Sequence, residues 1–327
     1  MSPSPPSLLE RYRDRLPVSQ RTPPLSLGEG ATPLVRAERL SRRLGMELWL
    51  KWEGANPTGS FKDRGMAVAI AKAVEEGARA VVCASTGNTA ASAAAYAAHA
   101  GLAAAVLQPA GAVALGKLAQ ARAHGARVLE VQGTFEEALA AARELARRGT
   151  HALVNSLNPY RLQGQKTAAF EILESLDGPP DVLALPYGGG GNTCAYGMGF
   201  EEAGARPRLL AAQAADRCST VASAIRIVEP VHRQEAEEHV RRSGGSVVTV
   251  SDEEILAAWR ELAELEGIFC EPASAASLAA LRQARPQGRI VCVLTGHGLK
   301  DPTTAERYSP APIPVDPDPD AIAAALG

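Results

Sequence analysis

The residues with the clearest chemical potential surround Lys62, in the segment NPTGSFKDRG at residues 56–65. Pro57 and Gly59 predict a turn. Ser60 is then expected to cap a helix, with Lys62 in its first turn. Because the helix macrodipole is positive at the N-terminus, a cation is unfavourable there, and with burial this favours a neutral amine able to form a Schiff base. An isolated lysine is usually a solvated cation, so the surrounding motifs decide between the two interpretations.

A second polar motif, ASTGNTAAS at residues 84–92, follows the apolar run ARAVVCA. Hydroxyl, amide and backbone N–H groups gather there at the expected start of an alanine-rich helix, on Ser85, Thr86, Asn88 and Thr89. Such a helix start suits a carboxylate or a phosphate. Taken by itself, the pattern is equally typical of an ordinary capped turn.

Two further motifs also follow apolar runs. Four successive glycines in PYGGGGNT, residues 186–193, can turn several backbone N–H groups onto one anion, although a flexible loop is the simpler interpretation. The motif matches neither a P-loop nor a dinucleotide-binding GxGxxG. The last motif, LTGHGLKD at residues 294–301, follows the run IVCVL. Ligands collect at the carboxyl ends of strands in doubly wound sheets, so the shared placement of all four motifs predicts one site.

The elements that must position these motifs alternate along the chain. Short apolar runs are separated by helix-length segments, which is typical of α/β proteins in which helices cover both faces of a parallel sheet. The expected strands are residues 48–52, 80–84, 103–107, 127–131, 182–186, 208–213 and 290–294. Capping boxes are expected to start helices where Thr134 precedes Glu137 and where Ser251 precedes Glu254.

The polar segment at residues 229–245 is expected to be a solvated surface element, and residues 309–327 a proline-stiffened tail with a short apolar helix. The net charge is -2 and 46% of the residues are hydrophobic, which argues against disorder and against a nucleic-acid partner. Five scattered cysteines and six histidines show no metal-ligand spacing, so no metal is expected. The N-terminus lacks an apolar core typical of signal peptides, and polar residues interrupt the longest uncharged stretch, so a cytoplasmic protein without membrane spans is expected.

The four motifs, together with NSLNPYRLQGQKTAAFEI and EPASAAS, occur in the order seen in threonine synthases, which are fold type II pyridoxal-phosphate enzymes of the tryptophan synthase beta-like superfamily. The resemblance covers nearly the whole chain from about Gly28. It implies a two-lobed α/β fold with doubly wound, mostly parallel sheets. Residues 1–52 and 155–327 would form a large cofactor-binding domain, and residues 53–154 a smaller, inserted, mobile domain. The resemblance also implies a homodimer.

The resemblance assigns roles to the matching residues. Lys62 would carry pyridoxal 5'-phosphate as a Schiff base, Asn88 would hydrogen-bond the 3'-oxygen of its ring, and Thr295 would face the ring nitrogen. The cofactor phosphate would lie on Gly188, Gly189, Gly190, Gly191 and Asn192. The carboxylate of the substrate would bind to Ser85, Thr86 and Thr89, and its phosphate to Asn155, Ser156 and Arg161. A guanidinium suits that role because it binds phosphate bidentately, although a surface arginine is the alternative for Arg161.

The implied reaction converts O-phospho-L-homoserine and water to L-threonine and phosphate by β,γ-elimination and replacement. One departure concerns the phosphate loop, because threonine synthases commonly read G-N-A-G-N there, whereas this chain has Gly189 and Gly190. Consecutive glycines are more similar to the pyridoxal-phosphate-dependent serine/threonine dehydratases, which are therefore the alternative enzyme. The segment between this loop and Ser251 is also short. A catalytically silent, metabolite-binding α/β protein is the alternative outside enzymes.

Overall fold

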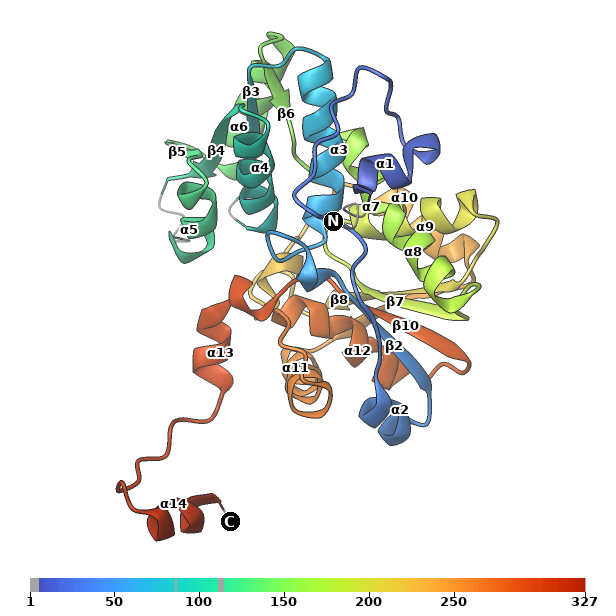
Figure 1. Cartoon of the computed structure of the whole chain (residues 1–327), viewed down its shortest axis with the longest axis vertical. Coiled ribbons are helices and arrows are strands. Elements are labelled where there is room, and N and C mark those ends of the chain that lie inside the picture. Colours follow the sequence, from blue (N-terminus) through green and yellow to red (C-terminus); the bar gives the residue numbers. More distant parts are fainter. Residues whose placement is uncertain (1–5, 86, 111–114, 327) are drawn as a thin grey trace, which may run out of the picture.

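The computed structural model describes residues 6–85, 87–110 and 115–326, and it contains two sheets covered by helices (Figure 1). The larger sheet has six strands in the order β1-β2-β10-β7-β8-β9, and the smaller has four in the order β5-β4-β3-β6. Neighbouring strands run parallel except β1, which pairs with β2 in the antiparallel sense. The expected two-lobed, doubly wound α/β class is thereby confirmed.

The strands have the following bounds. The larger sheet contains β1 (Leu34–Arg36), β2 (Glu47–Trp52), β7 (Val182–Pro186), β8 (Arg208–Ala214), β9 (Ser246–Val250) and β10 (Arg289–Leu294). The smaller sheet contains β3 (Ala80–Ala84), β4 (Ala103–Pro109), β5 (Arg127–Val131) and β6 (His151–Leu153). All seven strands expected from the sequence are present within two residues of their predicted ends. The three that were missed are β1 and β6, which are very short, and β9, which lies at an edge and is mostly exposed.

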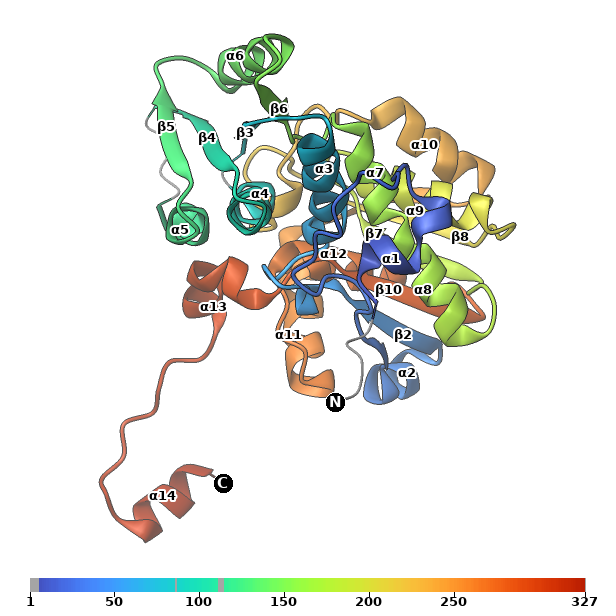
Figure 2. The same cartoon turned by 45° about the horizontal axis from the view of Figure 1, so that its top comes forward.

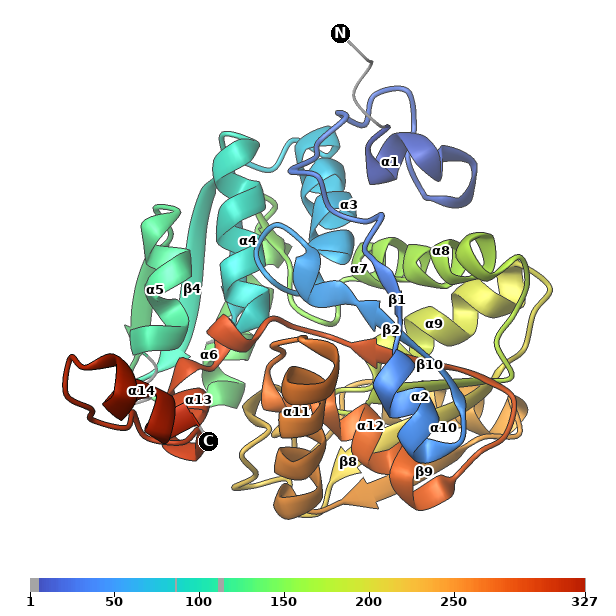
Figure 3. The same cartoon turned by 60° about the horizontal axis from the view of Figure 1, so that its bottom comes forward.

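Helices cover both faces of the larger sheet, so its central strands β7 and β10 are buried on both sides. On one face, α2 (Glu38–Leu44), α11 (Asp252–Glu266) and α12 (Pro272–Ala284) pack against Leu48, Leu50 and Val182 (Figure 3). The other face is covered by α8 (Thr167–Leu176), α9 (Gly191–Glu202) and α10 (Arg233–Arg242). Leu183 and Leu185 point to that second face, as the two-residue period of a strand requires. The helix predicted behind Ser251 packs one face against the core, through Ile255, Trp259 and Leu262.

The smaller sheet is covered in the same way. On one face lie α3 (Lys62–Glu75), α4 (Asn88–His99) and α5 (Leu115–Ala123), and on the other lies α6 (Phe135–Arg147) (Figure 2). All four strands fall between residues 53 and 154. The N-terminal helix α1 (Leu8–Arg11) packs against this lobe, since Leu8 and Leu9 share a hydrophobic cluster with residues of α3. The short helix α7 (Pro159–Gln165) crosses α3, where Gly164 lies against the backbone of Arg64.

Helix starts were partly predictable. Both capping boxes are confirmed, because the side chains of Thr134 and Ser251 accept hydrogen bonds from the backbone three residues later and the glutamates reach back. The expectation that Ser60 caps α3 is wrong. The N-cap is Phe61, without a side-chain cap, while Ser60 forms an isolated β-bridge with Gly296. The backbone of this loop is therefore held by a distant segment instead of by a local cap.

The C-terminal tail leaves the body of the molecule after α13 (Pro302–Tyr308). Its short apolar helix, α14 (Pro319–Leu326), stands apart from both lobes in Figures 1 and 2. Ile322 and Leu326 are exposed on it. Within the described part of the chain, the helices are all too short or too polar to cross a membrane.

Candidate active site

A cavity of about 790 Å³ lies between the carboxyl edges of the two sheets. In the larger sheet β2, β10 and β7 are parallel neighbours, so their carboxyl ends meet at one edge. In the smaller sheet the same holds for β3 and β6. The four sequence motifs follow β2, β3, β7 and β10, and all four contribute residues to the wall of the cavity. The topology thus brings together groups that are far apart in the chain.

The loop that leads into Lys62 is attached to the loop after β10. The backbone N–H of Phe61 donates to the carbonyl of Thr295 at 3.0 Å, and that of His297 donates to the carbonyl of Gly59 at 2.9 Å. These bonds flank the bridge between Ser60 and Gly296. Lys62, the first residue of α3, is therefore held close to the loop of Thr295, although the two residues are far apart in the sequence.

Lys62 lines the cavity, and its Nζ lies 4.3 Å from the centre of the Phe61 ring. Burial, helped by the charge of Arg161, lowers the pKa of Lys62 to about 7, and the carboxylate of Glu271 opposes both effects. A lysine in such an environment is available as a neutral amine near neutral pH, which is the state needed for nucleophilic attack or proton transfer. The sequence interpretation of Lys62 as a reactive amine is consistent with this environment.

An anion cradle lies at the glycine loop, where α9 begins at Gly191. The residue before it, Gly190, has a φ of 86°, and a Cβ there would approach the carbonyl oxygen of His232 to 2.7 Å. Within the described residues, the buried Nδ2 of Asn192 and Oγ1 of Thr193 have no hydrogen-bond partner. Free donors at the start of a 12-residue helix suit a phosphate-sized anion.

Thr295 lies on the cavity floor with its hydroxyl 3.1 Å from that of Ser274. Ser274 belongs to α12 and its Oγ also accepts a hydrogen bond from the backbone N–H of Gly296 at 2.9 Å. A hydroxyl, and not a carboxylate, is therefore presented at this position. Sequence reasoning found Thr295 but gave no role to Ser274, although the EPASAAS motif that contains it was recognised.

Asn88, the first residue of α4, faces an acid that sequence reasoning also missed. Its Nδ2 lies 3.2 Å from each carboxyl oxygen of Glu271. Burial raises the pKa of Glu271, while the Asn88 hydrogen bond and the charge of Lys300 act in the opposite direction. Glu271 and Lys300 both line the cavity. Both residues lie in motifs that the sequence analysis described, Glu271 in EPASAAS and Lys300 in LTGHGLKD, but neither was assigned a role there.

Of the expected substrate-binding residues, Ser85, Thr89, Asn155 and Ser156 line the cavity, whereas Thr86 lies outside the described residues. The amide of Asn155 donates to the carbonyl of Ala84 at 2.8 Å and accepts from its N–H at 2.9 Å. Asn155 therefore ties together the chain segments that leave β3 and β6. This leaves one amide hydrogen of Asn155 for a ligand.

Arg161 lies one layer behind the cavity wall and is only 1% exposed. Its Nη1 lies 3.3 Å from the carbonyl of Val154 and 3.5 Å from the hydroxyl of Thr89. Its Nε and Nη2 are buried without a partner in the part of the chain that the structure describes. Burial lowers the pKa of Arg161 to about 10. The alternative of a surface arginine is wrong, because the side chain is enclosed.

The segment between β8 and α10 forms one wall of the cavity, through residues 223–229 and Val231. The imidazole of His232 also lies there, with Nε2 2.9 Å from the carbonyl oxygen of Ser156. The expectation of a purely solvated element at residues 229–245 is therefore wrong for its beginning. It holds for α10, which buries only Ala236 and Val240. No sequence motif marked this wall. Among the described residues, His, Cys, Asp and Glu side chains form no cluster able to hold a metal ion.

Comparison with known proteins agrees with this geometry. The chain matches the family described as pyridoxal-phosphate dependent enzyme over residues 25–296. It is 50% identical over 320 residues to a threonine synthase of Halalkalibacterium halodurans, which covers 91% of this chain and 90% of the relative. It is 49% identical over 330 residues to a threonine synthase of Mycobacterium tuberculosis, with 94% and 92% covered.

Solved structures show the same fold. Maize serine racemase aligns with a TM-score of 0.75 at 23% identity, covering 84% of this chain and 91% of that one. A threonine deaminase from T.th. aligns with a TM-score of 0.72 at 26% identity, covering 90% and 98%. The chain therefore belongs to the pyridoxal-phosphate dependent enzymes and, within them, to the threonine synthase family.

Proposed function

We propose that this protein is a threonine synthase that converts O-phospho-L-homoserine and water to L-threonine and phosphate. The observation that carries this proposal is the buried guanidinium of Arg161 behind Thr89, whose Nε and Nη2 have no hydrogen-bond partner among the described residues. An enzyme that binds one phosphorylated cofactor needs one phosphate cradle, which the glycine loop offers. A substrate that carries its own phosphate requires a second cationic site, and Arg161 can supply it.

The residues present fit pyridoxal 5'-phosphate. The glycines at residues 188–191, the buried donors of Asn192 and Thr193, and the start of α9 would hold its phosphate. Lys62 would bind its aldehyde carbon, Asn88 its 3'-oxygen, and Thr295 would face its ring nitrogen. When bound, the cofactor supplies an electron sink for bonds broken at the substrate Cα and Cβ.

The protein side chains would bind the substrate at both ends. Ser85, Thr86 and Thr89, near the start of α4, would hold its carboxylate. Asn155, Ser156 and Arg161 would hold the phosphate attached at Cγ and stabilise the charge that grows on it as it leaves. Binding at both ends fixes the Cα and Cβ hydrogens relative to Lys62, which is an orientation effect.

Lys62 would then move the protons. A neutral amine with a pKa near 7 can remove protons from Cα and from Cβ. It can return one proton to Cγ after phosphate has left, which completes the methyl group of threonine, and one to Cα after water has added at Cβ. Because the hydroxyl of Thr295 is too weak an acid to protonate the ring nitrogen, the sink is modest, and the placement of the Lys62 amine becomes more important.

We further propose that residues 53–154 form a mobile domain that closes on residues 1–52 and 155–327 and excludes water until phosphate has left. The confinement of the four-stranded sheet to residues 53–154 supports this division. A cytoplasmic location is supported by five cysteines that are all free thiols. A homodimer is supported by the exposed apolar side chains of α14, which a second subunit would cover.

The serine/threonine dehydratase remains the second candidate, because Gly189 and Gly190 give this chain a dehydratase-like phosphate loop. The test incubates the purified holoenzyme with O-phospho-L-homoserine and, separately, with L-threonine. Phosphate and threonine released in equal amounts from the first substrate are expected. Ammonia and 2-oxobutyrate from the second substrate, without phosphate release from the first, would favour the dehydratase and refute the proposal.

A further inference from the structure

Glu271 is a buried acid in the cavity that the proposed reaction does not use. It is the N-cap residue of α12, is 4% exposed and lines the cavity. Its backbone N–H donates to the carbonyl of Gly296 at 3.0 Å, which fixes it beside the loop that carries Thr295. A Cβ on Gly296 would come within 2.5 Å of the Oε1 of Glu271, so the glycine makes room for this carboxyl group.

Two contacts define what this acid faces on the smaller lobe. Each of its carboxyl oxygens is 3.2 Å from the Nδ2 of Asn88, and its charge acts on the amine of Lys62. An amide that gives one N–H to a carboxylate has its second N–H and its oxygen fixed in direction. Glu271 thereby determines how Asn88, at the start of α4, presents its amide to a ligand in the cavity.

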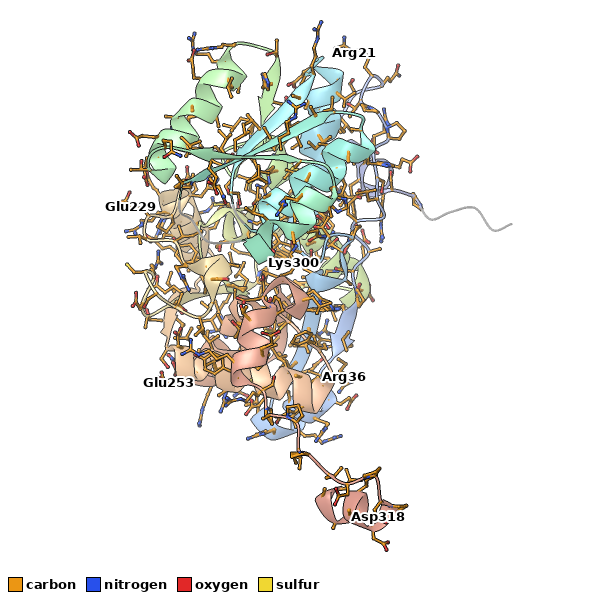
Figure 4. The ribbon with its side chains drawn as sticks, turned by 90° about the vertical axis from the view of Figure 1, so that its left-hand side faces the viewer. Arg21, Arg36, Glu229, Glu253, Lys300 and Asp318 are labelled. Atoms are coloured by element: carbon orange, nitrogen blue, oxygen red, sulfur yellow. The ribbon has the colours of Figure 1, made fainter. Side chains whose placement is uncertain are left out.

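Other charged and titratable groups face Glu271 from the elements packed around it. They are Lys300 and Asp301, beyond β10, and the thiol of Cys270. Lys300 donates to the carbonyl of Thr58 at 3.1 Å and also contacts Gln120 on α5, so it lies where the two lobes meet (Figure 4). Glu271 therefore lies near two lysines, Lys62 on the smaller lobe and Lys300 on the larger lobe.

We propose that Glu271 is a positioning residue of the active site: its carboxylate orients the Asn88 amide and supplies the negative charge that faces Lys62 and Lys300. The inference rests on the proposed attachment of the cofactor at Lys62. It goes beyond that proposal because it assigns to one side chain both the direction of the Asn88 amide and one of the influences on the proton affinity of Lys62.

The charge of Glu271 shifts the pKa of Lys62 in a known direction. Burial and the charge of Arg161 both lower the pKa of Lys62, whereas Glu271 raises it. Removing the carboxylate charge must therefore lower the pKa of Lys62 further. The hydrogen-bonding part is separable, because a glutamine at this position keeps an oxygen that can accept from Asn88 and an alanine does not.

The test compares Glu271→Gln and Glu271→Ala with the wild-type full-length chain. The first measurement is the pH dependence of Lys62 acetylation in the cofactor-free protein, followed by mass spectrometry. We expect the midpoint, near pH 7 in the wild type, to fall by about one pH unit in both variants. The matched control is Glu136→Gln, which removes an exposed carboxylate at the cavity rim and should leave the midpoint in place.

The second measurement is the dissociation constant of pyridoxal 5'-phosphate, read from the absorbance of the holoenzyme. We expect Glu271→Gln to bind nearly as tightly as the wild type and Glu271→Ala to bind about tenfold more weakly, because only alanine leaves Asn88 without its acceptor. A purely structural role would lower the melting temperature without moving the Lys62 midpoint.

An unchanged Lys62 midpoint in Glu271→Gln would overturn the inference, as would wild-type cofactor affinity in Glu271→Ala. Glutamine has nearly the same shape as glutamate, so the first measurement stands even if the alanine variant does not fold. Because neither measurement involves threonine or phosphohomoserine, the inference can succeed where the proposed substrate fails. A cofactor found on another lysine would instead refute both.

Discussion

Two basic residues in the first turn of α3 have opposite surroundings. Lys62 lines the cavity, and burial lowers its pKa to about 7. Arg64 is fully buried two residues later, where its guanidinium bonds to Glu53 and to Glu171 at 2.7 Å each. The charges of these carboxylates hold the pKa of Arg64 well above its usual range. One helical turn thus presents an amine of lowered pKa on one side and a paired ion cluster on the other.

The ion cluster around Arg64 joins segments that surround α3. Lys51 on β2 pairs with Glu171 on α8 at 2.7 Å and donates to the carbonyl of Thr32, while the hydroxyl of Thr32 bonds to Glu53. Each buried charge meets an opposite one, so burial costs less and the geometry becomes rigid. The comparison teaches that buried charge serves as scaffold where it is paired and is available for chemistry where it is not.

Arg161 allows the comparison to be made between residues of the same type. Arg64 and Arg161 are both at most 1% exposed. The five N–H groups of the Arg64 guanidinium share six acceptors, of which four are carboxylate oxygens. The Nε and Nη2 of Arg161 have no partner within the residues described. We therefore expect loss of Arg64 to reduce folding stability and loss of Arg161 to reduce binding.

The largest effect should follow from Lys62→Ala. Turnover of O-phospho-L-homoserine should fall by at least about 10³-fold, because the amine proposed to bind the cofactor and to move the protons would be absent. Steady-state phosphate release measures it. The matched control is Lys72→Ala, on the same helix, where the lysine pairs with Glu75 and should be dispensable for turnover. Activity within a few-fold of the wild type in Lys62→Ala would remove Lys62 from its assigned role.

The next effect concerns stability. Arg64→Met should lower the free energy of unfolding by about 3–5 kcal/mol, because it leaves the carboxylates of Glu53 and Glu171 buried beside too little positive charge. Urea denaturation of the cofactor-free protein measures it. A loss below about 1 kcal/mol would show that the ion cluster is not a scaffold and would break the comparison with Lys62.

Arg161→Met should give the opposite pattern. Its unfolding free energy should stay within about 1 kcal/mol of the wild type or increase, since burying an unpaired charge is itself costly. The KM for O-phospho-L-homoserine should rise about 100-fold because the proposed phosphate contact would be lost, whereas binding of L-homoserine, followed by the absorbance of the cofactor, should change little. Equal losses for both ligands would place Arg161 outside the phosphate site.

The pH dependence of the unfolding free energy should distinguish the ion cluster around Arg64 from Lys62. The pKa values of Glu53 and Glu171 are held below their usual range by Arg64, so their contribution is present above about pH 4.5 and is lost as the pH falls further. The lowered pKa of Lys62 means that the unfolded chain binds more protons between pH 7 and pH 10.5, so stability rises with pH across that window. Denaturation of the cofactor-free wild type and Lys62→Met should show this alkaline gain only in the former.

The sequence allowed the fold and the floor of the site to be predicted, but not the partners of each side chain. Strands such as β7 were predictable because their apolar runs are uninterrupted. The position of Lys62 in the cavity was predictable because its motif follows a strand, whereas its role in the reaction stays a prediction. Ser60 was misassigned because its partner, Gly296, is distant in sequence. Glu271 and Ser274 were given no role because their contacts with Asn88 and Thr295 arise only when α12 is placed against the other motifs. Local patterns predict elements, whereas pairing of buried polar groups depends on tertiary structure.

The smallest expected effect tests the glycine loop. A Cβ on Gly189 would meet only Ile227, at an ordinary contact distance of 3.5 Å, so Gly189→Asn should fold and bring an amide toward the substrate phosphate. One added hydrogen bond should lower the KM for O-phospho-L-homoserine by a few-fold. Gly190→Asn is the matched control, because its φ of 86° and the nearby carbonyl of His232 exclude a side chain. An unchanged KM in Gly189→Asn would mean that this position faces away from the substrate phosphate, and the dehydratase-like loop would then be no obstacle to threonine synthesis.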